Sequence, residues 1–152
     1  MEDLVEDLAR GNVTEVKVVL ASVVIVLAVY QLLLMAVGWG KVRVPFLSAK
    51  AASFSHRSVG DTILLVTMVV AFMCIGYFEI QDGIEHADKG EETRVLVHVI
   101  AAFALMATFV LKIIVVRWWH RMGRFLPVIG GTLFVLFLLT WITSAGDYLI
   151  GG

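Results

Sequence analysis

The stretch VVLASVVIVLAVYQLLLMAVGWG, residues 18–40, decides the fold of this chain because it is apolar over the thickness of a lipid bilayer. Roughly 20 apolar residues cross a membrane as a helix. Three further apolar runs follow at residues 62–78, 95–111 and 125–146. Since a bilayer offers no water to unpaired backbone groups, each run is predicted to be helical. The sequence therefore predicts an all-α fold, a bundle of four transmembrane helices.

Composition supports a membrane protein of one domain. Hydrophobic residues make up 60% and charged residues 16% of the 152 residues, and the mean hydropathy is +0.93. A soluble domain carries about 25% charged residues. No segment is left for a soluble catalytic domain, so any chemistry is expected inside the bundle or at its rims. We predict a single transmembrane domain over residues 1–152, with spans at about 15–40, 57–80, 93–119 and 125–148.

Charged residues are divided between the two ends of the predicted bundle. Basic residues dominate the first-to-second and third-to-fourth connections, which hold Lys41, Arg43, Lys50, Arg57, Arg117, Arg121 and Arg124. Acidic residues dominate the N-terminal segment and the loop at residues 79–92. Short basic loops stay in the cytoplasm. Both termini and the acidic loop are therefore predicted to lie outside, in a multi-pass protein of the plasma membrane.

Histidines are the leading candidates for chemistry because ionisable groups inside a membrane are costly and usually functional. His98 lies about one turn inside the third span, and its small alanine neighbours leave room for a flat ring such as haem b. A second axial ligand is expected from Met73, or from His86 if the outer loop folds inward. The plainer alternatives are a hydrogen-bonded structural histidine at 98 and a packing role for the methionine.

A second group of candidates lies at the cytoplasmic level. His56 is expected to open the second span and His120 to end the third, so together they could grip a second haem. Lys112 and Arg117 would then lie near its propionates and form charge-assisted hydrogen bonds. The alternatives are headgroup contacts for the histidines and snorkelling of the lysine to the interface. Hydroxyl groups late in the fourth span, at Thr140, Thr143 and Ser144, are expected to bond backbone carbonyls.

Four short segments carry a family resemblance: HRSVG at 56–60, KIIVVR at 112–117, LPVIGG at 126–131 and TWITS at 140–144. Over residues 55–148 the chain resembles small four-span proteins related to membrane cytochromes b and ferric-reductase-like transmembrane domains. The resemblance implies haem ligands at the positions of His56 and His98. A further histidine that the family often places late in the second span is replaced here by Met73 or Cys74, which implies His/Met ligation of an outer haem.

The sequence thus predicts a membrane electron-transfer protein that binds one haem b, or two, as a cytochrome b subunit of a membrane redox complex. The alternative is a haem-free accessory subunit of a larger complex. A small transporter is disfavoured because no charged residue is expected at mid-membrane and no span is clearly broken. Expected partners are membrane lipid, other membrane subunits, a quinone, and a basic soluble electron carrier drawn to the acidic outer face. No nucleic-acid partner is expected.

Overall fold

The computed structural model describes residues 12–77, 89–146 and 148–149. Its elements in chain order are α2 (Val13–Gly38), α3 (Ala49–Tyr77), α5 (Lys89–Arg117), the 3-10 helix η1 (His120–Phe125), α6 (Leu126–Trp141) and the π-helix η2 (Ile142–Gly146). Within the described residues, 4 helical segments are long and apolar enough to cross a membrane. The predicted four-helix transmembrane fold is confirmed, and the protein is a multi-pass membrane protein.

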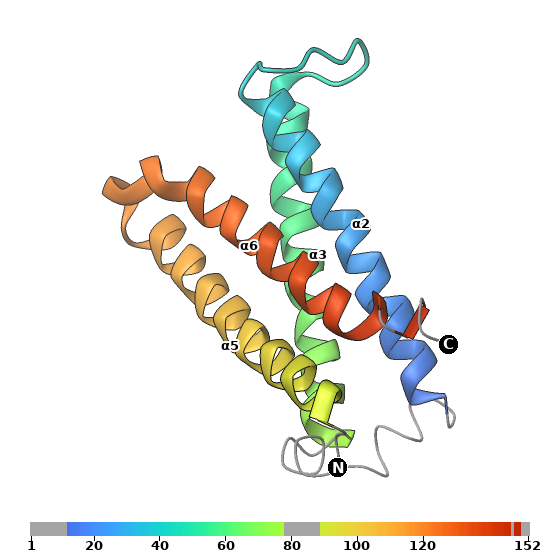
Figure 1. Ribbon diagram of the computed structural model, residues 1–152. Helices are drawn as coiled ribbons and strands as arrows, with labels where there is room; N and C mark the ends of the chain where they lie inside the picture. The colour runs from blue at the N-terminus through green and yellow to red at the C-terminus, as the bar shows by residue number, and fades with distance from the viewer. Residues whose placement is uncertain (1–11, 78–88, 147, 150–152) are drawn as a thin grey trace.

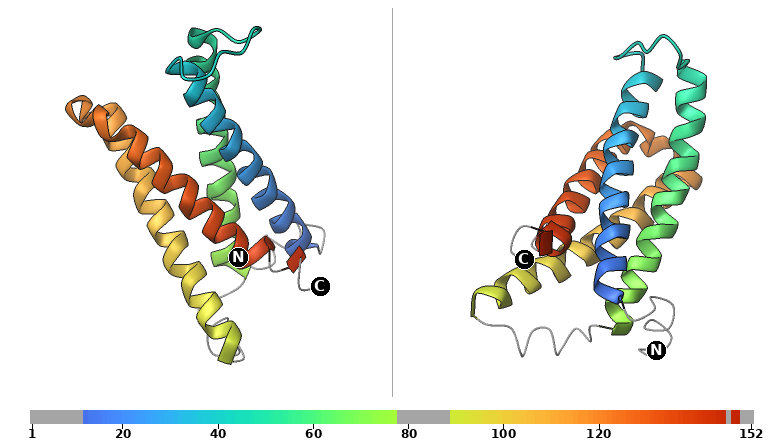
Figure 2. Two further views of the ribbon diagram at one scale, coloured as in Figure 1. Left: turned by 45° about the horizontal axis from the view of Figure 1, so that its top comes forward. Right: turned by 90° about the vertical axis from the view of Figure 1, so that its right-hand side faces the viewer.

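The helices form two antiparallel hairpins (Figure 1). Helix α2 packs along α3, and α5 packs along α6. The hairpins meet mainly where α2 contacts α6 and η2. Figure 2 shows that they converge near η2 and diverge toward the end that carries η1 and the connection at residues 39–48. The backbones of α2 and α6 therefore meet in the half of the bundle that contains the start of α2 and the end of α6.

A small core joins the hairpins, and most other apolar side chains face outward. Phe109 of α5 and Phe137 of α6 meet edge to face, with ring centroids 5.6 Å apart, and pack in one cluster with Ile63 of α3. Large side chains such as Leu65 and Phe103 stay 67% and 63% exposed. Helices that are apolar all round are stable only where lipid covers the outward face. The exposed apolar surface is therefore the lipid-facing surface.

Helix α3 begins eight residues before the span predicted at 57. The hydroxyl of Ser48 accepts a hydrogen bond from the backbone N–H of Ala51, which caps the helix start. Ala52 is fully buried in a cluster with Leu34 and Val37 of α2. The segment at 49–55, expected to be a loop, is helical because it has this cap, good helix formers and a buried contact.

This longer helix places polar residues further from its start than the sequence suggested. His56 lies seven residues after the start of α3, about 10 Å along the axis at 1.5 Å per residue. It does not open the span, as was expected. Asp61 is the thirteenth residue of the membrane-spanning segment Ala49–Ile75, so it lies midway along it. The sequence placed Asp61 just before the apolar run that begins at residue 62, whereas the structure places it inside one continuous helix.

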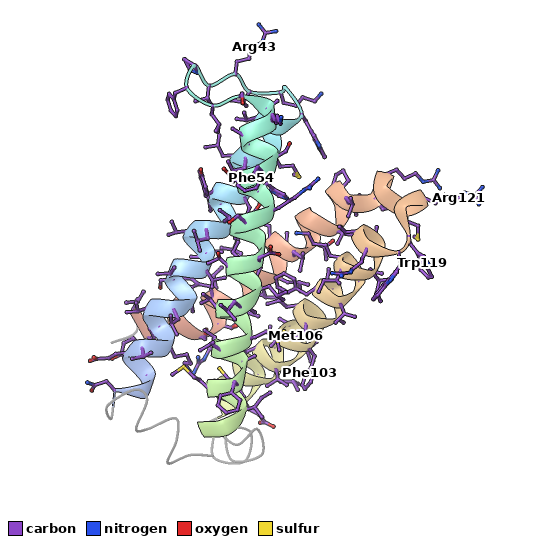
Figure 3. The ribbon with its side chains drawn as sticks, turned by 180° about the vertical axis from the view of Figure 1, so that it is seen from behind. Arg43, Phe54, Phe103, Met106, Trp119 and Arg121 are labelled. Carbon is purple, nitrogen blue, oxygen red and sulfur yellow. The ribbon has the colours of Figure 1, made fainter. Side chains whose placement is uncertain are left out.

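Basic residues gather at the end where the hairpins diverge. Figure 3 shows Arg43 and Arg121 at the tips of the two hairpins, with Trp119 below one tip. The start of α2 and the end of α6 lie together at the opposite end, where the indole of Trp141 donates to the hydroxyl of Ser22. The two described basic connections therefore share one end, as the charge pattern predicted.

We expect labelling to place that basic end in the cytoplasm. In a Cys74→Ser background, Glu15→Cys should react with a membrane-impermeant maleimide in intact cells. Arg43→Cys should react only after permeabilisation, and Arg121→Cys serves as its matched control on the other hairpin. Labelling of Arg43→Cys but not Glu15→Cys in intact cells would reverse the topology.

Close packing of α2 on α3 depends on Gly60. A Cβ atom at Gly60 would lie 3.2 Å from the Gln31 side-chain nitrogen, whereas one at Gly131 would meet nothing within 4 Å. Gly60→Val should therefore destabilise the protein by about 1–3 kcal/mol through overpacking. Gly131→Val carries the same change of propensity into open space. Equal unfolding free energies of the two variants in detergent micelles would refute the close contact.

Candidate functional site

A cavity of about 480 Å³ lies between the hairpins in the half of the bundle that holds the start of α2 and the end of α6. We call it the outer cavity, after the side that this end is predicted to face. All four long helices and η2 contribute to its walls, which are mainly apolar. Ligand pockets are typically about 300–1,000 Å³, with a few placed polar groups. The outer cavity therefore has the size and character of a site for a lipophilic ligand. Its polar side chains include Lys17, Thr67, Arg94, His98 and Thr143.

His98 of α5 is held across the hairpin by Thr143 of η2. The His98 Nδ1 atom lies 3.0 Å from the Thr143 Oγ1 atom. The same hydroxyl lies 2.8 Å from the carbonyl oxygen of Leu139, to which it donates its hydrogen. With that hydrogen used, the Thr143 oxygen has lone pairs to accept a hydrogen bond, which favours the neutral imidazole tautomer with its proton on Nδ1. The Nε2 atom keeps a lone pair that can ligate a metal or accept a hydrogen bond.

The backbone of Thr143 is held as well. Arg94, one helical turn before His98 on α5, donates from Nη1 to the Thr143 carbonyl oxygen over 2.9 Å. Two side chains from one face of α5 therefore grip one residue of η2 through its hydroxyl and its carbonyl. This double contact fixes the orientation of the imidazole relative to α6.

Glycine and hydroxyl side chains make up much of the π-helical turn that presents Thr143. A Cβ atom at Gly146 would lie 3.3 Å from the carbonyl oxygen of Trp141, the spacing that a π-helical turn produces. Ser144 donates from its hydroxyl to the Thr140 carbonyl over 2.8 Å, and Thr140 donates to the Leu136 carbonyl over 2.9 Å. The predicted bonding of these hydroxyls to backbone carbonyls is confirmed. Isolated π-helical turns occur frequently at functional sites.

Thr67 of α3 adds a buried polar group to the wall of the outer cavity. Its side chain is 7% exposed, and its hydroxyl oxygen has no hydrogen-bond partner among the described residues. Burying a polar group without a partner costs about 1–3 kcal/mol, so such a group usually has a ligand or water to bind. Sequence reasoning missed Thr67, because one threonine in an apolar run carries no distinguishing signal.

The structure separates Met73 from the site predicted for it. Met73 is buried, but it does not line the outer cavity. The neighbouring Cys74 does line it, as does Met106, which lies two turns after His98 on the same helix. The residue that reaches the cavity from late α3 is therefore the cysteine. His86, the other partner expected for His98, lies outside the described residues.

The predicted cytoplasmic haem site is not brought together as a large pocket. His56 and Lys112 line a cavity of only about 50 Å³, which we call the inner cavity. Arg117 is exposed at the end of α5. His120 begins η1, and its side chain lies outside what the structure describes. The pairing of His56 with His120 around a second haem therefore stays a prediction.

Gln31 of α2, also missed from the sequence, lines the inner cavity with His56. Its side-chain nitrogen donates to the His56 carbonyl over 2.8 Å. The sequence did carry a signal for Gln31, since it is a lone amide inside a 26-residue apolar helix. Averaging the hydropathy over the whole run conceals that signal.

The chain belongs to DUF6529, a family of unknown function whose model matches residues 5–151. The match includes the first span, which the resemblance to membrane cytochromes b and ferric-reductase-like domains left uncovered. No curated protein and no solved structure matches the chain.

Loss of the Thr143 hydroxyl should destabilise the site without changing its shape. Thr143→Val removes the hydroxyl acceptor of the half-buried His98 Nδ1, at a cost of about 0.5–1.5 kcal/mol. Thr132→Val, on the exposed face of α6, is the matched control and should cost less. Unfolding of both variants in detergent micelles measures the difference. Equal stability of the two variants would contradict the predicted hydrogen bond.

Proposed function

We propose that the outer cavity binds one haem b and that the protein is a membrane electron-transfer protein of the cytochrome b kind. The observation that carries the proposal is His98, whose Nδ1 is bonded to Thr143 so that Nε2 offers a lone pair at the wall of a 480 Å³ apolar cavity. A metal-ligating histidine usually donates its other ring N–H to an acceptor, as His98 does here.

The other residues of the cavity fit the same group. Lys17 and Arg94 are cations near the outer ends of α2 and α5, where they would pair with propionates. Cys74 lines the cavity from the opposite hairpin and offers a soft sulfur ligand in the place expected for Met73. Among the described residues no cluster of three or more His, Cys, Asp or Glu could hold a metal ion. That pattern suits a haem, which needs only one or two protein ligands.

The protein would bind the haem, orient it and shield it from water. When bound, the haem supplies reversible one-electron chemistry, and the protein tunes it through axial ligation, hydrogen bonding and burial. The Thr143 hydroxyl holds the imidazole in the Nδ1–H tautomer and increases the basicity of Nε2. Apolar walls exclude water and keep the local dielectric low. The lipid-facing surface would let the protein act inside a larger membrane redox complex.

A second candidate for the outer cavity is a quinol, favoured by the unpartnered hydroxyl of Thr67. The His98 Nε2 atom would accept a hydrogen bond from one quinol hydroxyl, and Thr67 would donate to or accept from the other oxygen. An oxidised quinone fits less well, because its carbonyls need donors and a neutral His98 uses its N–H on Thr143. A basic electron carrier docked at the outer face remains part of the proposal, although its expected docking loop lies mostly outside the described residues.

The test is a reduced-minus-oxidised spectrum and a pyridine haemochrome assay of the protein purified after expression with sufficient haem. The wild type should contain haem b at one per chain. His98→Ala should lose the Soret band while the protein still inserts in the membrane, and Thr143→Val should shift the band or the midpoint potential.

His56→Ala is the matched control, because it removes a membrane histidine from the inner cavity and should leave the spectrum unchanged. A haem-free wild type, or a spectrum that His98→Ala leaves intact, would reject haem ligation at this residue. Co-purified quinol that is lost in Thr67→Val would then support the second candidate. Absence of both ligands would leave an accessory subunit as the remaining function.

A further inference from the structure

The outer cavity is bordered on one side by two helices that make few contacts with each other. Within the described residues, α3 packs along α2 and α5 packs along α6, but α3 and α5 are not a closely packed pair. Both helices nevertheless line the cavity, with Ala71 and Ile75 from α3 and Ala102 and Phe103 from α5. The cavity wall between α3 and α5 is therefore formed without a helix–helix interface.

Ile75 and Phe103 belong both to this wall and to the outer surface of the bundle. They line the cavity, and yet they are 57% and 63% exposed. In Figure 3, which shows the bundle from behind, Phe103 and Met106 of α5 are seen beside α3, and both line the same cavity as Ile75. A large side chain that lines a cavity and is still mostly exposed lies at the rim of an opening. Because the exposed apolar surface faces lipid, this opening leads into the bilayer.

Small side chains leave room between the two rim residues. Ala71 lies one turn before Ile75 on α3, and Ala102 directly precedes Phe103 on α5. Small residues in membrane helices usually allow close helix packing. Since α3 and α5 make few contacts, the space that these two alanines leave here belongs to the cavity.

The polar rim of the cavity lies elsewhere, at the outer end of the bundle. Lys17 lies in the second turn of α2 and Arg94 in the second turn of α5, and both line the cavity. His98 lies one turn further along α5. The cavity thus has cations at the outer end and apolar side chains at its side. This arrangement is complementary to an amphiphile with acidic or polar groups at one end and an apolar body.

We propose that the opening framed by Ile75 and Phe103 is a lateral portal through which the outer cavity takes an amphiphilic ligand directly from the bilayer. The polar groups of the ligand lie toward Lys17 and Arg94, and its apolar part lies at the portal. The inference rests on the proposed function in treating the outer cavity as a ligand site. It adds the route of entry and the class of ligand, a molecule dissolved in the bilayer, to which haem b and a quinol both belong.

The experiment measures quenching of Trp141 fluorescence by lipid with brominated acyl chains. Trp141 lines the outer cavity, and it is the only tryptophan left in a full-length chain with Trp39→Phe, Trp118→Phe and Trp119→Phe. This parent chain, purified without bound haem, is reconstituted in brominated phosphatidylcholine. Bromine quenches an indole only at close range, so acyl chains that enter the portal should quench Trp141. In Ala71→Phe, whose ring fills the portal, the quenching should fall several-fold.

Ala107→Phe is the matched control, because it makes the same change on the exposed face of α5, away from the cavity wall; it should preserve the quenching. Circular dichroism and gel filtration show whether each variant retains its fold. Ala102→Leu narrows the portal from the other helix and replaces Ala71→Phe if that variant does not fold.

An unquenched Trp141 in the parent chain would overturn the portal. Quenching that Ala71→Phe or its replacement leaves at the level of Ala107→Phe would overturn it as well, because lipid would then reach the indole by another route. The probe is a lipid and the protein carries no haem, so a failure of haem binding would reject the proposed function without changing this result.

Discussion

A polar side chain inside a bilayer has no water to bond, so its hydrogen bonds must come from the protein, and the rest of this structure depends on that constraint. At the outer end, the hydroxyl and carbonyl of Thr143 form hydrogen bonds with His98 and Arg94 of α5. At the inner end, Gln31 donates a hydrogen bond to the backbone of α3. These hydrogen bonds help to hold the helices together. Apolar surfaces alone give little preference for helix contact over lipid contact, because lipid tails are equally apolar.

The two hairpins divide the polar groups into two levels with different properties. The outer level has a roomy apolar cavity, a fixed imidazole and two cations near its mouth. The inner level has a space of water size, a second imidazole and a lysine. Phe109 and Phe137 pack edge to face between them. The ligand chemistry proposed for the outer level therefore does not involve the polar groups of the inner level.

Much of the fold was predictable, because apolar runs of membrane length leave few alternatives. The depth of His98 followed from the same runs. Its partner Thr143, 45 residues later in sequence, was not predictable, since the pairing depends on a π-helical turn that no sequence pattern marks. The start of α3 was misplaced because alanine and serine resemble a loop by hydropathy, although they favour a capped helix. That error placed His56 at the surface and concealed its cavity with Gln31.

The π-helical turn also makes this protein sensitive to chain length at a single place. A π-helical turn accommodates one more residue than an α-helical turn, so it corresponds to a one-residue insertion in a regular helix. Deleting one residue within Ile142–Gly146 would restore α-helical spacing and leave the residues after it on nearly the same side of the helix, because the wide turn absorbs the extra residue. Tyr148, which lines the outer cavity, would stay beside it. Thr143 would lose the wide turn that presents it to His98, so a chain with a regular turn here would keep four spans without that contact.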